Sequence, residues 1–98
     1  MVKTYKNKDG ITFKGLQYTG KNLKEFHDIL NDPDNKMGIF VRLGSNTIVI
    51  EDAQSLFFIF YGRQLELKKG DHFLYSQESG LFGVFNSTEL KEEFEQVK

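Results

Sequence analysis

The sequence predicts a single α+β domain over residues 1–98, in which a curved, mainly antiparallel sheet of six or seven short strands is flanked by two short helices. Three observations predict this fold class. The middle of the chain alternates short apolar runs with turn residues. One segment near each end repeats apolar residues at helical spacing. The chain of 98 residues has a single-domain length and shows no internal repeat.

The first predicted strand covers Ile11–Tyr18. Residues that favour strands dominate this stretch, and Gly10 and Gly20 bound it. Gly15 interrupts the alternation of apolar and polar residues, which marks it as a candidate bulge. We therefore expect a strand that is bulged near its middle.

The first predicted helix spans residues 23–31. Asn22 is a suitable N-cap, and Glu25 follows at the spacing of a capping box. Asp32-Pro33 ends the element. Its apolar residues recur at helical spacing: Leu23, Phe26 and Leu30. One face of this helix is therefore expected to be buried.

A series of strands follows this helix, separated by turns rich in Gly, Asn, Ser and Asp. The predicted strands are Gly38–Leu43, Thr47–Glu51, Leu56–Tyr61, Leu65–Lys68, His72–Tyr75 and Leu81–Phe85. Gly44-Ser45-Asn46 has the composition of a hairpin turn between the first two.

The strand Leu56–Tyr61 is apolar throughout, as expected of a strand that is buried on both faces. In so short a chain, one of those faces could instead meet a second copy or a partner protein. The sequence therefore leaves two interpretations open for this strand, core or interface, and a homo-oligomer is one of the predicted states.

The second predicted helix begins at Asn86 or Ser87. Asn86 and Glu89 have capping-box spacing. An apolar stripe follows: Leu90, Phe94 and Val97. Because an isolated helix of this length is marginal in water, the stripe is expected to lie against the sheet, with an acidic face outward.

Composition indicates a globular, cytoplasmic protein. Hydrophobic residues make up 39% of the chain, ten residues are Phe, and Cys is absent, so a disulfide framework is excluded. The N-terminal residues are not followed by the apolar run of a signal peptide, and no apolar stretch is long enough to cross a membrane. The net charge of −1 favours no polyanionic partner.

No constellation of residues in the sequence indicates catalysis, a metal or a cofactor. The two histidines, His27 and His72, are far apart in the sequence and have no metal-ligand spacing. The serines fall at turns and element ends, outside a nucleophile elbow. Arg42 and Arg63 are isolated from the aromatic strand, which argues against nucleic-acid binding. The sequence therefore predicts a protein that is not an enzyme.

Three segments carry a resemblance that spans most of the chain. They are Gln17-Tyr18-Thr19-Gly20 followed by Asn22-Leu23 and Glu25, Leu67-Lys68-Lys69-Gly70-Asp71 before an apolar strand, and Gly80 before an aromatic strand and a final Phe94-Glu95-Gln96-Val97. In this pattern the chain resembles a loose group of small bacteriophage and prophage accessory proteins of unassigned function. It departs from them at His72, where they carry an aromatic or large aliphatic residue, and residues 34–53 show no match.

The resemblance implies a phage-encoded accessory protein and supplies no binding or catalytic residues. The leading hypothesis is a non-enzymatic binding module made inside an infected bacterium, which occupies a host or phage protein or a small ligand and can thereby inhibit a host defence protein. Its predicted contact face is the acidic helix. The acidic residues concerned are Glu89, Glu92 and Glu93.

Two alternatives stay open. One is an oligomeric sponge that sequesters a nucleotide signal in a pocket lined by aromatic and basic residues. The candidate residues for that pocket are Arg42, Arg63, His72 and Tyr75. The other is a structural or assembly protein of the virion.

Overall fold

A computed structural model describes residues 2–30, 47–52, 54–60, 63–76 and 79–97, and these residues form two helices and eight strands. In chain order the elements are β1 (Lys3–Asn7), β2 (Thr12–Gln17), α1 (Leu23–Leu30), β3 (Thr47–Glu51), β4 (Ser55–Phe60), β5 (Arg63–Lys68), β6 (His72–Ser76), β7 (Leu81–Phe85), α2 (Ser87–Glu93) and β8 (Phe94–Val97). The predicted α+β class with antiparallel pairing is confirmed.

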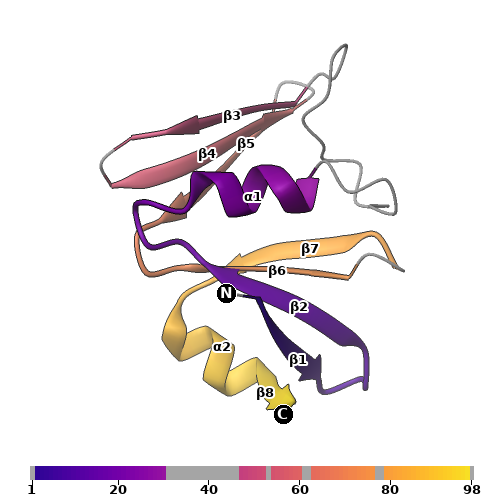
Figure 1. The fold of residues 1–98 in the computed structure, drawn as a ribbon. Helices are drawn as coiled ribbons and strands as arrows, with labels where there is room; N and C mark the ends of the chain where they lie inside the picture. Colours follow the sequence, from indigo (N-terminus) through magenta and orange to yellow (C-terminus); the bar gives the residue numbers. More distant parts are fainter. Residues whose placement is uncertain (1, 31–46, 53, 61–62, 77–78, 98) are drawn as a thin grey trace.

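The strands form two sheets, where the sequence predicted one. The five-stranded sheet has the order β7-β6-β2-β1-β8, and the three-stranded sheet has the order β3-β4-β5. Helix α1 lies between the two sheets, and α2 covers the opposite face of the five-stranded sheet (Figure 1). Each face of the five-stranded sheet is therefore covered by one helix, which explains why its strands carry apolar residues on both sides.

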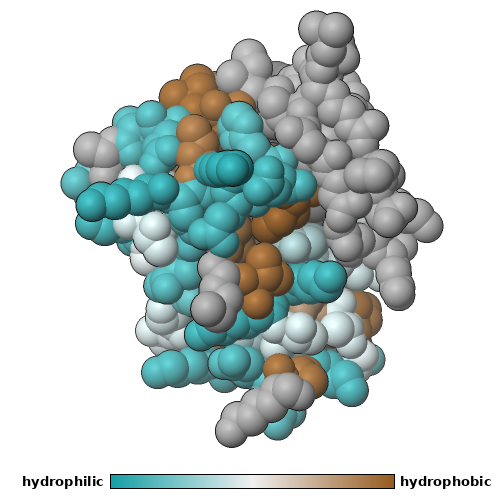
Figure 2. Space-filling view, in the orientation of Figure 1, coloured by the Kyte–Doolittle hydropathy of each residue, from teal (hydrophilic) through white to brown (hydrophobic). Residues whose placement is uncertain are grey.

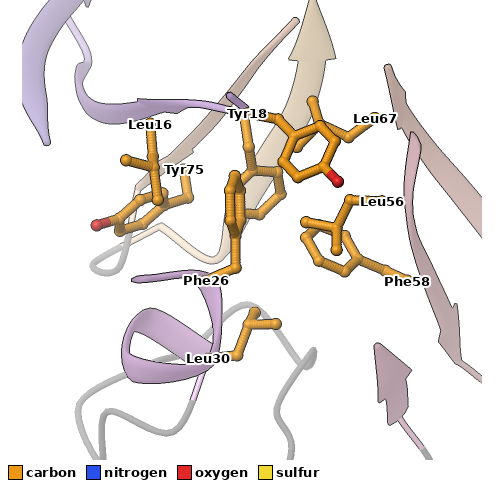
Figure 3. Close-up of a cluster of buried hydrophobic side chains, with 9 residues drawn as sticks. Leu16, Tyr18, Phe26, Leu30, Leu56, Phe58, Leu67 and Tyr75 are labelled. Carbon is orange, nitrogen blue, oxygen red and sulfur yellow. The ribbon is translucent and has the colours of Figure 1, made fainter. Parts of the chain in front are cut away.

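The larger core fills the space between the two sheets, around α1 (Figure 3). Its buried members are Leu16, Tyr18, Phe26, Leu30, Leu56, Phe58, Leu67, Phe73 and Tyr75. Phe26 is the centre of this cluster, because its ring lies 5.9 Å from that of Phe58 and 6.2 Å from that of Phe73. Phe26 and Leu30 are four residues apart and so share one face of α1, as the helical spacing predicted.

The smaller core lies between α2 and the five-stranded sheet. Its buried members are Tyr5, Phe13, Leu74 and Leu90, with Ile11, Phe85 and Phe94 packed against them. The two cores draw on alternate residues of the same strands: in β6, Phe73 belongs to the larger cluster and Leu74 to the smaller one. Leu90 of α2 is buried here, which confirms that the second helix lies against the sheet.

Tyr18 joins the two sheets at the end of β2. Its amide donates to the carbonyl of Asp71 at 2.9 Å, and its carbonyl accepts from the amide of Gly70 at 2.8 Å. Its hydroxyl donates to Oε1 of Glu51 at 3.1 Å and lies 3.2 Å from the carbonyl oxygen of Asp52. One fully buried residue thus connects β2, the β5–β6 turn and the β3–β4 turn.

The C-terminal segment differs from the prediction. The second helix was expected to continue through Val97, but it ends at Glu93, and Phe94 has extended backbone angles. Residues Phe94–Val97 form β8, which pairs with β1 in the register Tyr5↔Gln96. Pairing with β1 satisfies the backbone groups that face this neighbour, which helical continuation would have to satisfy within the segment. Strand pairing therefore prevails over the helical spacing of the apolar residues. Val97 is consequently exposed.

The bulge predicted near Gly15 is absent. Residues 14–17 pair with β6 in unbroken register, with Gly15 opposite Leu74. A side chain is excluded at this position for another reason: a Cβ on Gly15 would lie 2.6 Å from Cε2 of Tyr5. Gly15 therefore makes room for the Tyr5 ring, which lies across β2.

Strand β4 is buried on one face and partly open on the other. Leu56 and Phe58 are fully buried in the larger core, whereas Phe57 and Ile59 on the other face are half-buried. Ile50 of β3, opposite Phe57, is 46% exposed. Hydrophobic side chains appear as small patches among hydrophilic ones in the view of Figure 2. Self-association through this face stays a prediction. The predicted strand Gly38–Leu43 lies outside the described residues.

Replacing Tyr18 by Phe tests the junction between the sheets. Tyr18→Phe keeps the ring but removes the donor to Glu51, so we expect the free energy of unfolding to fall by about 1–3 kcal/mol. Burial, together with the carboxylate of Glu51, raises the pKa of Tyr18 from 10.0 to about 12. The wild type should therefore lose stability as the pH rises from 10 towards 12, since the unfolded chain ionises first.

The measurement is urea unfolding at a series of alkaline pH values. Tyr18→Phe should show a shallower loss of stability over this range, with the remaining slope contributed in part by Tyr5, whose pKa burial also raises. A variant that is as stable as the wild type at neutral pH and has the same alkaline slope would contradict the role given to Tyr18.

Candidate functional site

A groove runs between α2 and the five-stranded sheet, whose edge strand β8 contributes to its lining. Two overlapping cavities, of about 280 Å³ and 270 Å³, make up this groove, and both are lined by Tyr5, Gln17 and His72. We call it the α2 groove. The other lining residues are Lys3, Gly15 and Thr19 in the first cavity, and Ser87, Leu90, Lys91, Phe94 and Gln96 in the second.

Strand alternation brings the floor of the α2 groove together. Lys3 and Tyr5 are alternate residues of β1 and therefore face the same side of the sheet. Lys3 lies opposite Gly15 in the register of β1 and β2. Gln17, two residues beyond Gly15, lies opposite His72 of β6. Three neighbouring strands thus direct polar side chains towards α2.

The capping box of α2 places the opposite wall. Oδ1 of Asn86 accepts from the amide of Glu89 at 2.8 Å, and Oε1 of Glu89 accepts from the amide of Asn86 at 3.0 Å. This confirms the capping box that the sequence predicted and begins the helix at Ser87. Leu90 then anchors the helix to the sheet. Ser87 consequently lies close to His72, with 3.3 Å between Oγ and Nε2.

The β5–β6 turn holds Gln17 and His72 in place. Nε2 of Gln17 donates to the carbonyl of Gly70 at 3.0 Å. Gly70 has a φ of 97°, a left-handed conformation that glycine adopts without strain. Oδ2 of Asp71 accepts from the amide of Lys68 at 3.1 Å, which closes the turn. His72 follows directly, so its position depends on this turn.

The electrostatics of the α2 groove favour a neutral His72 beside positive charges. Burial lowers the pKa of His72, the charge of Asp71 offsets part of this effect, and the charge of Lys3 lowers the pKa by a smaller amount. Burial also raises the pKa of Tyr5, so its hydroxyl stays protonated at neutral pH. Lys3 and Lys91 carry positive charge, and no carboxylate belongs to the described residues that line the groove.

The pair formed by His72 and Ser87 is the closest approach to a catalytic arrangement in this groove. A serine nucleophile needs a histidine base that a third group orients. Within the described part of the chain, the one hydrogen bond of the His72 side chain is the contact with Ser87. Asp71 is engaged with the backbone of its own turn. Nor do the described residues bring three His, Asp or Glu side chains together around a possible metal ion.

The structure separates the residues that the nucleotide-sponge alternative would combine. His72 faces the α2 groove, whereas Tyr75, three positions along β6, points into the larger core on the opposite face of the sheet. Arg63 is exposed at the start of β5, in the other sheet. Arg42 lies outside the described residues. Of the three described residues, only His72 lines this groove.

The acidic residues of the second helix have different roles. Glu89 is a structural residue, since its carboxylate completes the capping box. Glu92 and Glu93 are exposed. These two line a separate shallow depression beside Lys6 and Lys8. Substituting Glu89 would therefore weaken the helix itself. To test the predicted contact face on α2 without disturbing the helix, only Glu92 and Glu93 should be substituted.

Sequence reasoning missed most of the α2 groove. Lys3 and Tyr5 were not selected because β1 was not predicted, and Gln17 was not selected as a site residue although its strand was predicted. The sequence did contain a signal for β1: Lys3, Tyr5 and Asn7 are alternate residues, and in a strand alternate residues lie on the same face. Gln96 was hidden by the prediction that residues 94–97 were helical.

Comparisons with protein-family models, with curated proteins and with solved structures found no match to this chain. Neither of the two described helices has the length and apolar character needed to span a membrane.

Glu89→Ala should weaken α2 without altering the charge pattern elsewhere. Loss of the capping contact is expected to lower the free energy of unfolding by about 0.5–2 kcal/mol, as measured by urea denaturation. Glu92→Ala is the matched control, because it removes the same charge from an exposed position of the same helix and should change stability much less. Equal effects of the two substitutions would contradict the capping role.

The titration of His72 tests the electrostatics of the groove. NMR should give a pKa below the usual 6.5 for His72, and Lys3→Gln should raise this pKa. Because the unfolded chain takes up the proton more readily, the free energy of unfolding should decrease as the pH falls through 6.5. Lys14→Gln, which changes an exposed lysine on the opposite face of β2, should leave the titration unchanged. A His72 pKa above 6.5 would contradict this description.

Proposed function

We propose that this protein is a non-enzymatic binding module whose α2 groove holds a small polar ligand. The observation that carries the proposal is the convergence of Tyr5, Gln17 and His72 from three strands on both cavities of the groove. Ligand sites commonly combine apolar walls with a few polar groups that fix orientation. Here Leu90 and Phe94 are part of the apolar wall.

The size of the groove supports a small ligand. Cavities that bind drug-sized molecules range from about 300 to 1,000 Å³. Each of the two cavities, of about 280 Å³ and 270 Å³, lies just below this range, and the groove that they form together reaches only its lower part. An ion or a small metabolite fits such a volume, whereas a large cofactor would extend beyond it.

Binding rather than catalysis is supported by the surroundings of His72. Its partner, Ser87, is an exposed residue at the start of a two-turn helix. The contact of 3.3 Å between them is long for a hydrogen bond to a hydroxyl. In the described residues, His72 also lacks the hydrogen-bonded carboxylate that would orient it as a base. The two side chains suit ligand recognition, in which each offers a donor or acceptor.

The resemblance to phage accessory proteins supports a role for this module in a bacterium infected by a phage. We propose that it acts in an infected bacterium by occupying a host component, which can be a ligand that a host protein needs or the host protein itself. Under the second form of this proposal, the exposed Glu92 and Glu93 would be the contact residues on α2. Inhibition of a host defence protein is a further proposal that rests on the resemblance alone.

A pair of tryptophan substitutions tests the proposal. Gln96→Trp places a large ring in the α2 groove, whereas Glu95→Trp places it on the other face of β8. Both positions are exposed and lie on an edge strand, which tolerates an aromatic residue. A panel of small polar metabolites is then screened by thermal denaturation and by amide chemical shifts.

We expect at least one class of metabolite to stabilise the wild type and the Glu95→Trp protein, since a ligand of the native state adds about 2.7 kcal/mol at one hundred times its Kd. Gln96→Trp should reduce or abolish this stabilisation. Ligand binding that is equally strong in both variants would place the site elsewhere. The absence of any binding to the wild type would count against a small-ligand function.

A further inference from the structure

The charges and donors of the α2 groove specify the chemistry of its ligand further. Lys3 lines its first cavity, Lys91 lines its second, and His72 lines both. Neutral polar residues also line it: Tyr5, Gln17, Thr19, Ser87 and Gln96. The chain as a whole carries 13 basic and 14 acidic residues, so a lining without a carboxylate among the described residues is a local departure from its composition.

The acidic side chain that acts on His72 is that of Asp71, whose charge shifts the pKa of His72 more than the charge of Lys3 does. Asp71 precedes His72, but its carboxylate accepts a hydrogen bond from the amide of Lys68 within the turn. The polar groups that line the groove with His72 are Lys3 and Tyr5 on β1, Gln17 on β2, Ser87 and Lys91 on α2, and Gln96 on β8. Asp71 opposes the positive charge at His72 but does not line the groove, so the described part of the lining itself has a net positive charge, which favours a bound anion.

We propose that the α2 groove binds a small oxyanion, either free or as the terminal group of a metabolite, and that His72 takes up a proton when the oxyanion binds. This inference rests on the proposed binding function and names the chemical class of its ligand. An oxyanion would accept hydrogen bonds from the lysine ammonium groups and from the neutral donors. Protonated His72 would offer donors at both ring nitrogens, whereas the neutral ring offers only one.

Proton uptake follows from the position of His72. Without a ligand, burial favours the neutral imidazole, and its effect on the pKa of His72 exceeds the opposing effect of Asp71; the charge of Lys3 adds a smaller effect in the same direction as burial. A bound anion next to the ring favours the charged form, which raises the pKa of His72. By linkage, the oxyanion must then bind more tightly as the pH falls. Binding of a neutral molecule would leave this pKa close to its value in the free protein.

Sulfate, methanesulfonate and dimethyl sulfone form a matched set of probes for this inference. They share tetrahedral sulfur and oxygen geometry and differ in charge: sulfate is doubly charged, methanesulfonate singly charged, and dimethyl sulfone neutral. None of them titrates near neutral pH, so any pH dependence of binding belongs to the protein. Sulfate represents a free oxyanion, and methanesulfonate represents an oxyanion attached to an organic group.

The experiment measures amide chemical shifts and the titration of His72 with each probe at constant ionic strength. Thermal shifts alone are insufficient, because sulfate stabilises many proteins by exclusion from their surface. We expect sulfate to shift the amides of residues 3, 17, 72 and 87 and to raise the pKa of His72. Its affinity should increase roughly threefold to tenfold between about pH 8 and about pH 5.5, as expected for one ionising histidine.

Three variants separate the contributions to binding. Lys3→Gln should weaken sulfate binding by up to roughly fivefold, which is the effect of one exposed charge, while Lys14→Gln should leave it unchanged. His72→Gln keeps a polar side chain that cannot be charged, so it should abolish the pH dependence. The amide spectrum of each variant reports whether the protein is folded.

The possible outcomes distinguish this inference from the proposed function. Methanesulfonate binding in the groove would support an organic oxyanion, and binding by sulfate alone would support a free one. If dimethyl sulfone binds as tightly as the anions, or if anions bind without changing the His72 titration, the oxyanion inference is overturned while a small-ligand site remains. If no probe and no metabolite of the panel shifts the groove amides, both proposals fail.

Discussion

The amide, the carbonyl and the hydroxyl of Tyr18 are all hydrogen-bonded, and together they connect the two sheets. Its backbone pairs with the β5–β6 turn in both directions, and its hydroxyl reaches Glu51 and the backbone of Asp52 in the β3–β4 turn. The ring is fully buried and packs edge-on against Phe26 of α1, with 6.2 Å between the ring centroids. Burying a hydroxyl is costly unless it is paired, so these contacts must form together with the core.

The same contacts set the geometry of the α2 groove, which lies on the other side of the sheet from the larger core. Gln17 and Thr19 flank Tyr18 along the chain, and Asp71, which accepts from its amide, is adjacent to His72. The hydrogen bond from the Gln17 side chain to the carbonyl of Gly70 further connects β2 to the β5–β6 turn; we call this region around Tyr18 the corner. A ligand that contacts Gln17 and His72 therefore meets side chains that the folded core already positions, which reduces the entropy lost on binding.

The sequence predicted the elements with strong local signals. The segment around Phe26 and Leu30 forms a helix, the capping box at Asn86 begins another, and the strand containing Phe58 contributes to the core. The terminal strands β1 and β8 escaped prediction for different reasons. The alternation of Lys3, Tyr5 and Asn7 in β1 was not used, whereas β8 follows α2 directly and pairs with β1 at the opposite end of the chain, so it leaves no local pattern. The groove was missed with them, since Lys3 and Gln96 lie on these strands; only His72 was selected.

The central claim is that the corner around Tyr18 is rigid and holds the α2 groove in a preformed shape. Native-state hydrogen exchange measures this directly, because the amides of Tyr18 and Gly70 are both bonded within the corner. The account predicts that these two amides exchange only in the global unfolding of the protein, as do the central amides of β2 and β6. Exchange of Tyr18 and Gly70 through local opening, while the strand amides stay protected, would contradict it.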